Sequence, residues 1–143
     1  MDVDWLIIAD SAQVVGGKLF LLGGGWDRLT LNQPPPRPHS MAVAVAVAVP
    51  WHETNRKHLF KIDITDGDGT KSLATIEGEF EVGRNAGLVE GQPQRMQLAG
   101  NLMLNIPQFG SYSIVASIDG EEKKSVPFYV VAGPGAPAKS RQP

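Results

Sequence analysis

The side chains with the clearest capacity for chemistry lie in an acidic, glycine-containing segment. Four oxygen-bearing residues stand at the spacing of positions one, three, five and twelve of a calcium-binding EF-hand loop: Asp66, Asp68, Thr70 and Glu77. Lys71, however, occupies the sixth position, where that loop needs glycine. An Asp-Gly-Asp-Gly run is also typical of a tight turn. We therefore expect a turn, with a weak loop-borne metal site at Asp66 and Asp68 as the alternative.

A row of glutamates follows this segment. Glu77, Glu79 and Glu81 alternate along one expected strand, which places their carboxylates on one face at intervals of about 6.6 to 7 Å. Carboxylates at such distances act as acid and as nucleophile or base in glycoside hydrolases, but in a concave, partly apolar pocket that raises one pKa. A regular outward face is instead solvated. The row therefore predicts a solvated face, with an acid–base hydrolase as the less favoured alternative.

The histidines give no sign of a metal or catalytic centre. His39, His52 and His58 do not share one element at ligand spacing, so we interpret them as polar surface residues. Lys18 follows two glycines but precedes leucine, whereas a phosphate-binding P-loop needs serine or threonine there and a helix start. We assign no catalytic residue and no cofactor.

The tryptophans differ in context. Trp5 alternates with Val3 and Ile7 in an apolar run, which predicts a core position. Trp26 and Trp51 border loops, where an indole can support the core or stack on a ligand. If the chain has a ligand surface, we expect it near Trp26 and Trp51.

Composition limits the possible classes of protein. The chain has 143 residues, which suits one domain, and no cysteine, which excludes disulfides and fits a reducing compartment. Its net charge of −2, with scattered basic residues, argues against nucleic-acid binding. Met41 to Val49 is the longest apolar run and is shorter than the roughly 20 residues of a membrane helix. Without a visible export signal, we expect a soluble, cytoplasmic protein.

One strand stands out among the elements that must position these residues. Met41 to Val49 alternates alanine and valine strictly and stops at Pro50. The alternation predicts a strand with Val43, Val45, Val47 and Val49 on one face and Ala42, Ala44, Ala46 and Ala48 on the other. We expect the valines to enter a core and the alanines to let another surface approach closely.

Glycines and prolines divide the rest of the chain into short alternating runs. Gly16 and Gly17 suit the two-residue turn of a hairpin. The segments 58–65 and 74–82 predict a second hairpin with a three-residue loop, Gly67 to Gly69, which pairs Ile62 with Ala74. Pro127 cannot donate to a ladder, so the last strand should lie at an edge or leave that position unpaired.

This punctuation predicts an all-β fold with no crossover helices. About eight or nine strands, most with one polar face, favour a two-layer antiparallel β-sandwich in a single domain over residues 1–132, with a barrel as the alternative. Residues 133–143 lack core-forming side chains, so we expect a disordered tail rich in proline and glycine.

Several stretches also resemble a known family. They are ADSAQVVGGKLFLLGGGWDRL (9–29), VPWHETNRKHLFKIDITDGDG (49–69), FGSYSIVASIDG (109–120) and VPFYVV (126–131). Together they are similar to small, uncharacterised bacterial proteins of unknown function. The resemblance implies a β-sandwich of immunoglobulin-like character, and it transfers no catalytic or binding residue.

These observations favour a non-catalytic β-sandwich that binds a protein partner or assembles with itself. The face formed by Ala42, Ala44, Ala46 and Ala48 is a possible interaction surface, because a row of small side chains permits close packing of another surface. Either the chain's own loops cover this face or, if the protein assembles, a neighbour does. The main alternative is a module that binds carbohydrate or calcium through Trp51, Asp66 and Asp68. A hydrolase that uses the glutamate row is a third hypothesis.

Overall fold

The computed structural model describes residues 1–84 and 86–135. Within these residues the chain forms nine strands and one short 3-10 helix, η1 (Trp51–Glu53). The strands are β1 (Asp2–Val15), β2 (Lys18–Gly24), β3 (Arg28–Leu31), β4 (Arg37–Val49), β5 (Lys57–Asp66), β6 (Ser72–Glu81), β7 (Gln94–Ile106), β8 (Gly110–Ile118) and β9 (Glu121–Ala132). The predicted all-β class is confirmed.

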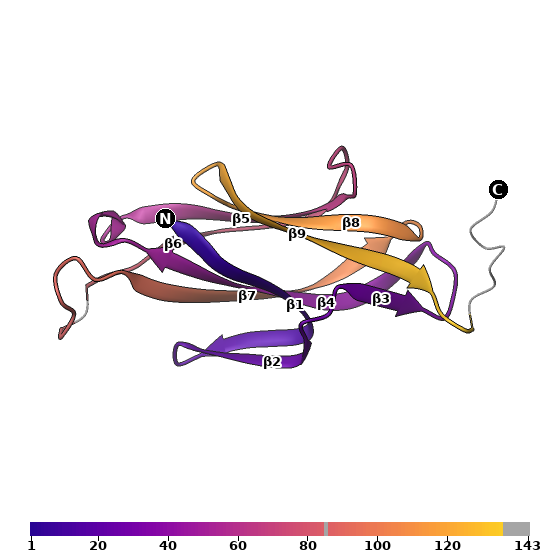
Figure 1. The fold of residues 1–143 in the computed structure, drawn as a ribbon, viewed down its shortest axis with the longest axis horizontal. Helices are drawn as coiled ribbons and strands as arrows, with labels where there is room; N and C mark the ends of the chain where they lie inside the picture. The colour runs from indigo at the N-terminus through magenta and orange to yellow at the C-terminus, as the bar shows by residue number, and fades with distance from the viewer. Residues whose placement is uncertain (85, 136–143) are drawn as a thin grey trace.

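The strands form two sheets that pack face to face (Figure 1). Sheet A has the order β2-β1-β4-β7, and sheet B has the order β3-β9-β8-β5-β6. The chain passes from sheet A to sheet B at the glycines 23–25, which end β2 and precede β3. The predicted two-layer sandwich is therefore confirmed, and the triple glycine is one of its corners.

The core lies between the two sheets. The valines of β4 point into it as predicted, and Val47 and Val49 are 0% exposed. Sheet B contributes Ile62, Ile114 and Phe128 to the same cluster. Tyr112, near the start of β8, stacks on Phe128, and its hydroxyl donates a hydrogen bond to the Gln108 carbonyl (2.5 Å).

β1 changes phase near its start. A β-bulge between Val3 and Trp5 shifts the register of β1 against β4. Val3 and Leu6 consequently both point into the core, whereas Trp5 lies opposite Ala46 and packs on the outer side of sheet A. The prediction that Trp5 is a core residue in phase with Val3 is wrong, because one extra residue reverses the alternation of faces.

β9 shows how the sheet accommodates a proline. β3 pairs with β9 only from Tyr129 to Ala132, so on that side Pro127 has no ladder partner among the described strands. This confirms the predicted unpaired position. The β3–β9 pairing is parallel, which corrects the prediction of a wholly antiparallel sandwich.

The β5–β6 hairpin has a different register from the predicted one. Ile62 pairs with Ile76, and Ile64 pairs with Ala74, so the offset from the predicted pairing is two residues. A bulge between Ile64 and Thr65 accompanies the longer loop. The apolar faces of the two strands still coincide, because a shift of two residues preserves the alternation of faces.

The end of the chain is described only in part. The Gly133 N–H donates a hydrogen bond to the Leu31 carbonyl (2.7 Å), so the first residue of the expected disordered tail is held beside β3. Residues 136–143, which make up most of that expected tail, lie outside the described residues.

Candidate interaction surface

The N-terminal hairpin leaves sheet A and returns across its outer side. β1 pairs with β4 as far as Ala9 and with β2 from Ala9 to Val15. Gly16 and Gly17 have φ angles of +58° and +75°, which favour glycine, and they form the predicted two-residue turn. In Figure 1 the hairpin lies as a separate layer below β4 and β7.

The alanine face of β4 lies beneath this layer. A buried cluster consists of alanines from β1 and β4: Ala9, Ala12, Ala42 and Ala44. Ala42, Ala44 and Ala46 are 0% exposed, and Ala48 is partly buried. The possible interaction surface at Ala42, Ala44, Ala46 and Ala48 is therefore not open, and of the two expected kinds of cover, the chain itself or a neighbour, the structure shows the first. The chain itself covers them, since small side chains let the hairpin approach to van der Waals distance.

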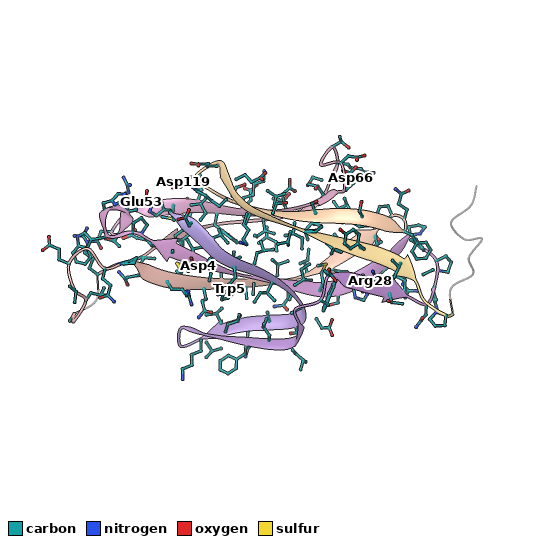
Figure 2. The ribbon with its side chains drawn as sticks, in the orientation of Figure 1. Asp4, Trp5, Arg28, Glu53, Asp66 and Asp119 are labelled. Atoms are coloured by element: carbon teal, nitrogen blue, oxygen red, sulfur yellow. The ribbon has the colours of Figure 1, made fainter. Side chains whose placement is uncertain are left out.

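Two amide side chains of β7 hold the hairpin in place. The Asn101 side chain donates to the Ala12 carbonyl (2.7 Å) and accepts from the Ala12 N–H (3.1 Å). Gln97 donates to the Gly17 carbonyl at the tip of the hairpin (2.8 Å). Trp5 and Leu19 pack against the alanine cluster from the hairpin side (Figure 2 labels Trp5). The hairpin is thus attached to sheet A by hydrogen bonds and by apolar contact.

The opposite face of the hairpin is open and carries large apolar side chains. Val15, Phe20 and Leu22 are 54%, 52% and 72% exposed there, next to their polar cross-strand partners Lys18, Gln13 and Ser11. A hollow of about 300 Å³ on this side is lined by Ser11, Ala12, Gln13, Phe20, Leu21 and Leu22. Lys18 is the only charged residue of β2. Large apolar side chains that gather on one exposed element mark a surface that can bind another molecule.

Trp26 and Trp51, where a ligand surface was expected, do not lie on the hairpin. Trp26 is partly buried, and its indole meets the Phe128 ring edge-on, with 6.4 Å between ring centroids. Trp51 lies in η1, where the Arg84 guanidinium sits 4.2 Å from the centre of its ring. Arg84 also donates to the Trp51 carbonyl (2.9 Å). Trp26 therefore supports the core, and one face of Trp51 is occupied by a cation.

Asp66 holds the β5–β6 loop closed. Its carboxylate accepts hydrogen bonds from the Thr70 N–H (2.9 Å), the Thr70 hydroxyl (3.1 Å) and the Lys71 N–H (3.3 Å). Desolvation works to raise the pKa of Asp66, but these hydrogen bonds hold the pKa below its usual value. Gly69, with φ of +73°, takes the left-handed position predicted for it. Asp66 thus has the geometry of a turn residue.

The residues of the alternative carbohydrate or calcium site, Trp51, Asp66 and Asp68, do not all lie close together. Figure 2 places Glu53, at the end of η1, and Asp66 at opposite ends of the sandwich. Asp68 and Asp66 share a hollow of about 400 Å³ with Phe109, Ser111 and Tyr112, and Trp51 does not line it. Among the described residues, no group of three histidine, aspartate or glutamate side chains could hold a metal ion.

The glutamate row lies on an outer strand. Glu77, Glu79 and Glu81 are exposed on β6, at the end of sheet B. Glu77 and Glu79 border a shallow hollow of about 460 Å³ together with Leu59 and Lys61 of β5. The arrangement is an open, charged strand face.

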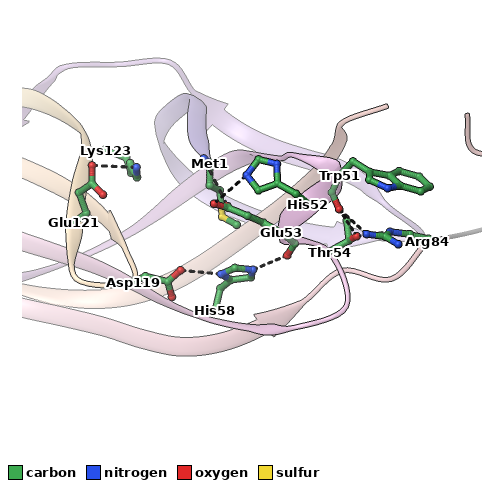
Figure 3. A network of polar contacts seen from close by, with 10 residues as sticks. All are labelled: Met1, Trp51, His52, Glu53, Thr54, His58, Arg84, Asp119, Glu121 and Lys123. Atoms are coloured by element: carbon green, nitrogen blue, oxygen red, sulfur yellow. Dashed lines mark hydrogen bonds and ion pairs between the residues drawn. The ribbon is translucent and has the colours of Figure 1, made fainter. Parts of the chain in front are cut away.

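A buried histidine was missed by the sequence interpretation. His58 is 4% exposed, and its ring stacks near Phe80. Figure 3 shows its Nδ1 bonded to an Asp119 carboxylate oxygen (2.7 Å) and its Nε2 bonded to the Glu53 carbonyl (2.8 Å). Because a carbonyl and a carboxylate only accept, both ring nitrogens donate, which requires the charged imidazolium. The prediction that His58 is a polar surface residue is wrong.

The pKa values of this pair follow from the same contacts. Burial lowers the pKa of His58, but the hydrogen bonds to Asp119 and Glu53 outweigh burial and bring the pKa above its usual value. The hydrogen bond from His58, with that from the Leu59 N–H (2.9 Å), holds the pKa of Asp119 below its usual value. With both nitrogens engaged, the His58 ring has no free position from which to act as a base. The pair ties the η1 loop to the β8–β9 turn.

The exposed residues of β2 also escaped the sequence interpretation. Lys18, Phe20 and Leu22 alternate with Leu19 and Leu21, so either face of the strand could have entered a core. The one available signal was that both faces are apolar, as in the alanine-valine strand. A strand of that kind must be covered on both sides or remain exposed on one.

The sequence matches a known protein family over most of its length. A sequence model for a family of unknown function, DUF6941, matches residues 4–131, which span all nine strands in whole or in large part. The chain belongs to this family. The DUF6941 match thus covers both sheets and the hairpin, and it confirms the resemblance to a domain family without an assigned function.

Other comparisons add little to the DUF6941 assignment. No curated protein matches the chain significantly. Among solved structures, the chain is similar to Pseudomonas fluorescens alkylpurine DNA glycosylase AlkC bound to DNA containing an abasic site analog, with a TM-score of 0.40 and 11% identity. The match covers 89% of this chain and 30% of that one, so this chain spans less than a third of its length. Within the described residues, no helix is of the length and apolarity needed to cross a membrane.

Proposed function

We propose that this chain is a non-catalytic protein-binding module and that the outer face of its β1–β2 hairpin is the contact surface. The observation that carries the proposal is the exposure of Val15, Phe20 and Leu22 on one face of a hairpin that is anchored on its other face. Burying such side chains against a partner is favourable by roughly 25 cal/mol per Å² of apolar area, before the costs of association.

The way in which the hairpin is attached to sheet A supports a role in protein binding. Asn101 and Gln97 hold the hairpin to sheet A, so its outer face is presented in a defined orientation before a partner arrives. A preorganised surface loses less conformational entropy on binding than a loose loop does. The non-catalytic part of the proposal rests on the open, charged face of β6 and on the fully engaged ring of His58.

Capture from a lysate of the native host tests the proposal if it is compared between variants. Wild type and the double variant Phe20→Ser/Leu22→Ser are used as bait, with Leu59→Ser as the matched control. Leu59 is 59% exposed on β5, on the other sheet. We expect mass spectrometry to identify one or more proteins, including untagged copies of this chain, that wild type and Leu59→Ser retain and the hairpin variant loses.

A set of captured proteins that is the same for all three baits would refute the proposed surface. Circular dichroism and thermal unfolding of the hairpin variant establish that it is folded. Both replaced side chains are already exposed, so we expect stability within about 0.5 kcal/mol of wild type.

We further propose an immunoglobulin-like character for the sandwich and a cytoplasmic location. The orders β1-β4-β7 and β9-β8-β5 correspond to the order of strands in the two sheets of immunoglobulin domains. The hydrogen bond from the Tyr112 hydroxyl to the Gln108 carbonyl has the form of a tyrosine corner, which recurs in such sandwiches. The cytoplasmic location rests on a sequence without cysteine, which fits a reducing compartment.

A further inference from the structure

The outer edge of β2 carries unpaired backbone groups. The two-residue turn makes Val15 and Lys18 a hydrogen-bonded pair, and hydrogen-bonded pairs alternate along an antiparallel ladder. The N–H and C=O groups of Leu19 and Leu21 therefore point away from β1, toward the free edge. β2 is the terminal strand of sheet A, and all its residues except Leu19 are exposed. The edge is thus open to another strand.

The sequence of β2 carries little of the usual protection of such an edge. Natural edge strands carry charges, prolines or inward-pointing polar residues, which discourage pairing with another chain. From Lys18 to Leu22 the strand contains no proline and no charge other than Lys18. The occupant that fits this edge is an extended segment of apolar sequence.

We infer that β2 pairs antiparallel with β2 of a second copy of this chain, with Phe20 on the two-fold axis. The inference rests on the proposed function and names the partner for the same surface. In this register Leu19 of each copy faces Leu21 of the other, so the outward backbone groups of both residues form hydrogen bonds. Sheet A becomes continuous across the two copies through their hairpins.

Charge favours this register. Each Lys18 lies opposite Leu22 of the other copy, and the two ammonium groups stand at opposite ends of the shared ladder. The pairing therefore keeps the two like charges apart.

Backbone geometry excludes the neighbouring registers. An axis through Leu21 would pair Leu19 with Gly23, whose φ of +61° departs from the extended conformation. An axis through Leu19 would pair Leu21 with Gly17, whose φ of +75° belongs to the turn. Only an axis through Phe20 uses the regular stretch from Lys18 to Leu22 in both copies.

The side chains of the outer face also fit. Phe20 meets Phe20 of the second copy as a non-hydrogen-bonded pair, the pair type with the closest side chains. Leu22, the most exposed large apolar residue of the chain at 72%, lies beside them in both copies. The pairing thus joins two small apolar surfaces into one.

Single cysteines test the register directly, because the natural chain contains none. In a non-hydrogen-bonded pair the two Cα atoms are about 4.5 Å apart, within the range that a disulfide spans. We expect Phe20→Cys to form a disulfide-linked dimer under mild oxidation. Lys18→Cys alone and Leu22→Cys alone should not, because like residues lie roughly 13 Å apart in this register. An equimolar mixture of these two variants should form the mixed disulfide.

Analytical ultracentrifugation of wild type measures the association of two copies without any substitution. We expect a reversible monomer–dimer equilibrium between roughly 1 µM and roughly 1 mM, the range of small interfaces. The mixture of Lys18→Cys and Leu22→Cys keeps Phe20, so it tests the register even if Phe20→Cys folds poorly.

Two results would overturn the inference: a wild-type chain that stays monomeric over this range, or a mixture that yields no mixed disulfide. If the hairpin variant then still loses a different protein that wild type captures, the second-copy inference fails and the proposed function stands. If wild type is monomeric and capture does not depend on the hairpin, both fail.

Discussion

β2 and β6 are terminal strands of the two sheets, and they present opposite surfaces to solvent. On β6 the exposed alternating positions are Glu77, Glu79 and Glu81. On β2 they are Lys18, Phe20 and Leu22. A second β6 would place carboxylates opposite carboxylates, whereas a second β2 places apolar side chains together. The difference supports the proposed pairing through β2, because β6 carries a row of charges that opposes pairing and β2 does not.

The same two regions are anchored by different chemistry. The β1–β2 hairpin is held by neutral amides, Asn101 and Gln97, and by the alanine cluster. The β5–β6 region is tied to its surroundings by the ionised pair of His58 and Asp119, with His58 opposite Phe80 of β6. Attachment of the hairpin should therefore be insensitive to pH, whereas that of the β5–β6 region should not.

The largest expected effect comes from giving β2 the charge pattern of β6. In the variant Lys18→Glu/Phe20→Glu/Leu22→Glu, we expect association to weaken about 30-fold or more, because central interface residues contribute about 2 kcal/mol or more. Sedimentation equilibrium measures the change. The control is Leu59→Glu, on the outer face of β5, which should associate like wild type. Unchanged association of the triple variant would place the contact elsewhere.

The next effect concerns the attachment of the hairpin. Asn101→Ala removes both hydrogen bonds to the buried backbone of Ala12, so we expect the free energy of unfolding to fall by about 1 to 2 kcal/mol. Urea unfolding measures the loss, and faster amide exchange at Ala12 locates it. Asn105→Ala, at an exposed position of the same strand, is the control and should cost less than about 0.5 kcal/mol. Equal losses for the two variants would contradict the anchoring role.

A smaller effect comes from the reverse exchange on β6. In the background of the β2 triple variant, Glu77→Leu/Glu79→Phe should restore some association, this time through β6. Removing like charges across such an edge is worth roughly 0.2 to 1 kcal/mol per pair, so the new association should be weak. Light scattering over a concentration series measures it. A chain that stays monomeric would show that charge alone does not distinguish the two edges.

The smallest effect is a pH dependence confined to the β5–β6 region. The raised pKa of His58 contributes stability that is complete below its usual value of about 6.5 and is lost as pH rises through the higher folded value. The lowered pKa of Asp119 contributes stability that is present above its usual value and is lost as pH falls through the folded one. Stability from the pair should therefore be greatest between these limits. The effect is small because the Asp119 side chain is 50% exposed.

Unfolding free energies of wild type and His58→Gln, measured from pH 5 to pH 9, test this dependence. We expect the difference between them to narrow as pH rises from about 6.5. Parallel curves would mean that the imidazolium is not the stabilising form. Asn101→Ala should run parallel to wild type over the same range, because its hydrogen bonds involve no ionisable group.

Local patterns predicted the parts of the fold that depend on neighbours in sequence. The alternation of β4, the glycine turn at Gly16 and Gly17 and the interrupted ladder at Pro127 all follow from backbone geometry within a few residues. Local patterns did not predict the bulge that turns Trp5 away from the core, because both faces of that strand carry apolar residues. They did not predict the longer β5–β6 loop either, because both registers bring the apolar faces of the two strands together. Alternation determines which residues share a face, but not which face is inside.

The candidate surface shows the same division. The sequence by itself determined a two-sided apolar strand at Met41 to Val49 and the need to cover its alanines. Only the tertiary structure decided that the covering layer is the chain's own hairpin. As a result Ala42 and Ala44 are buried, and Phe20 and Leu22 on the outer face of the hairpin are exposed. The physical reason is that burial is a property of two surfaces in contact. A strand pattern specifies one of them, and the path of the whole chain supplies the other.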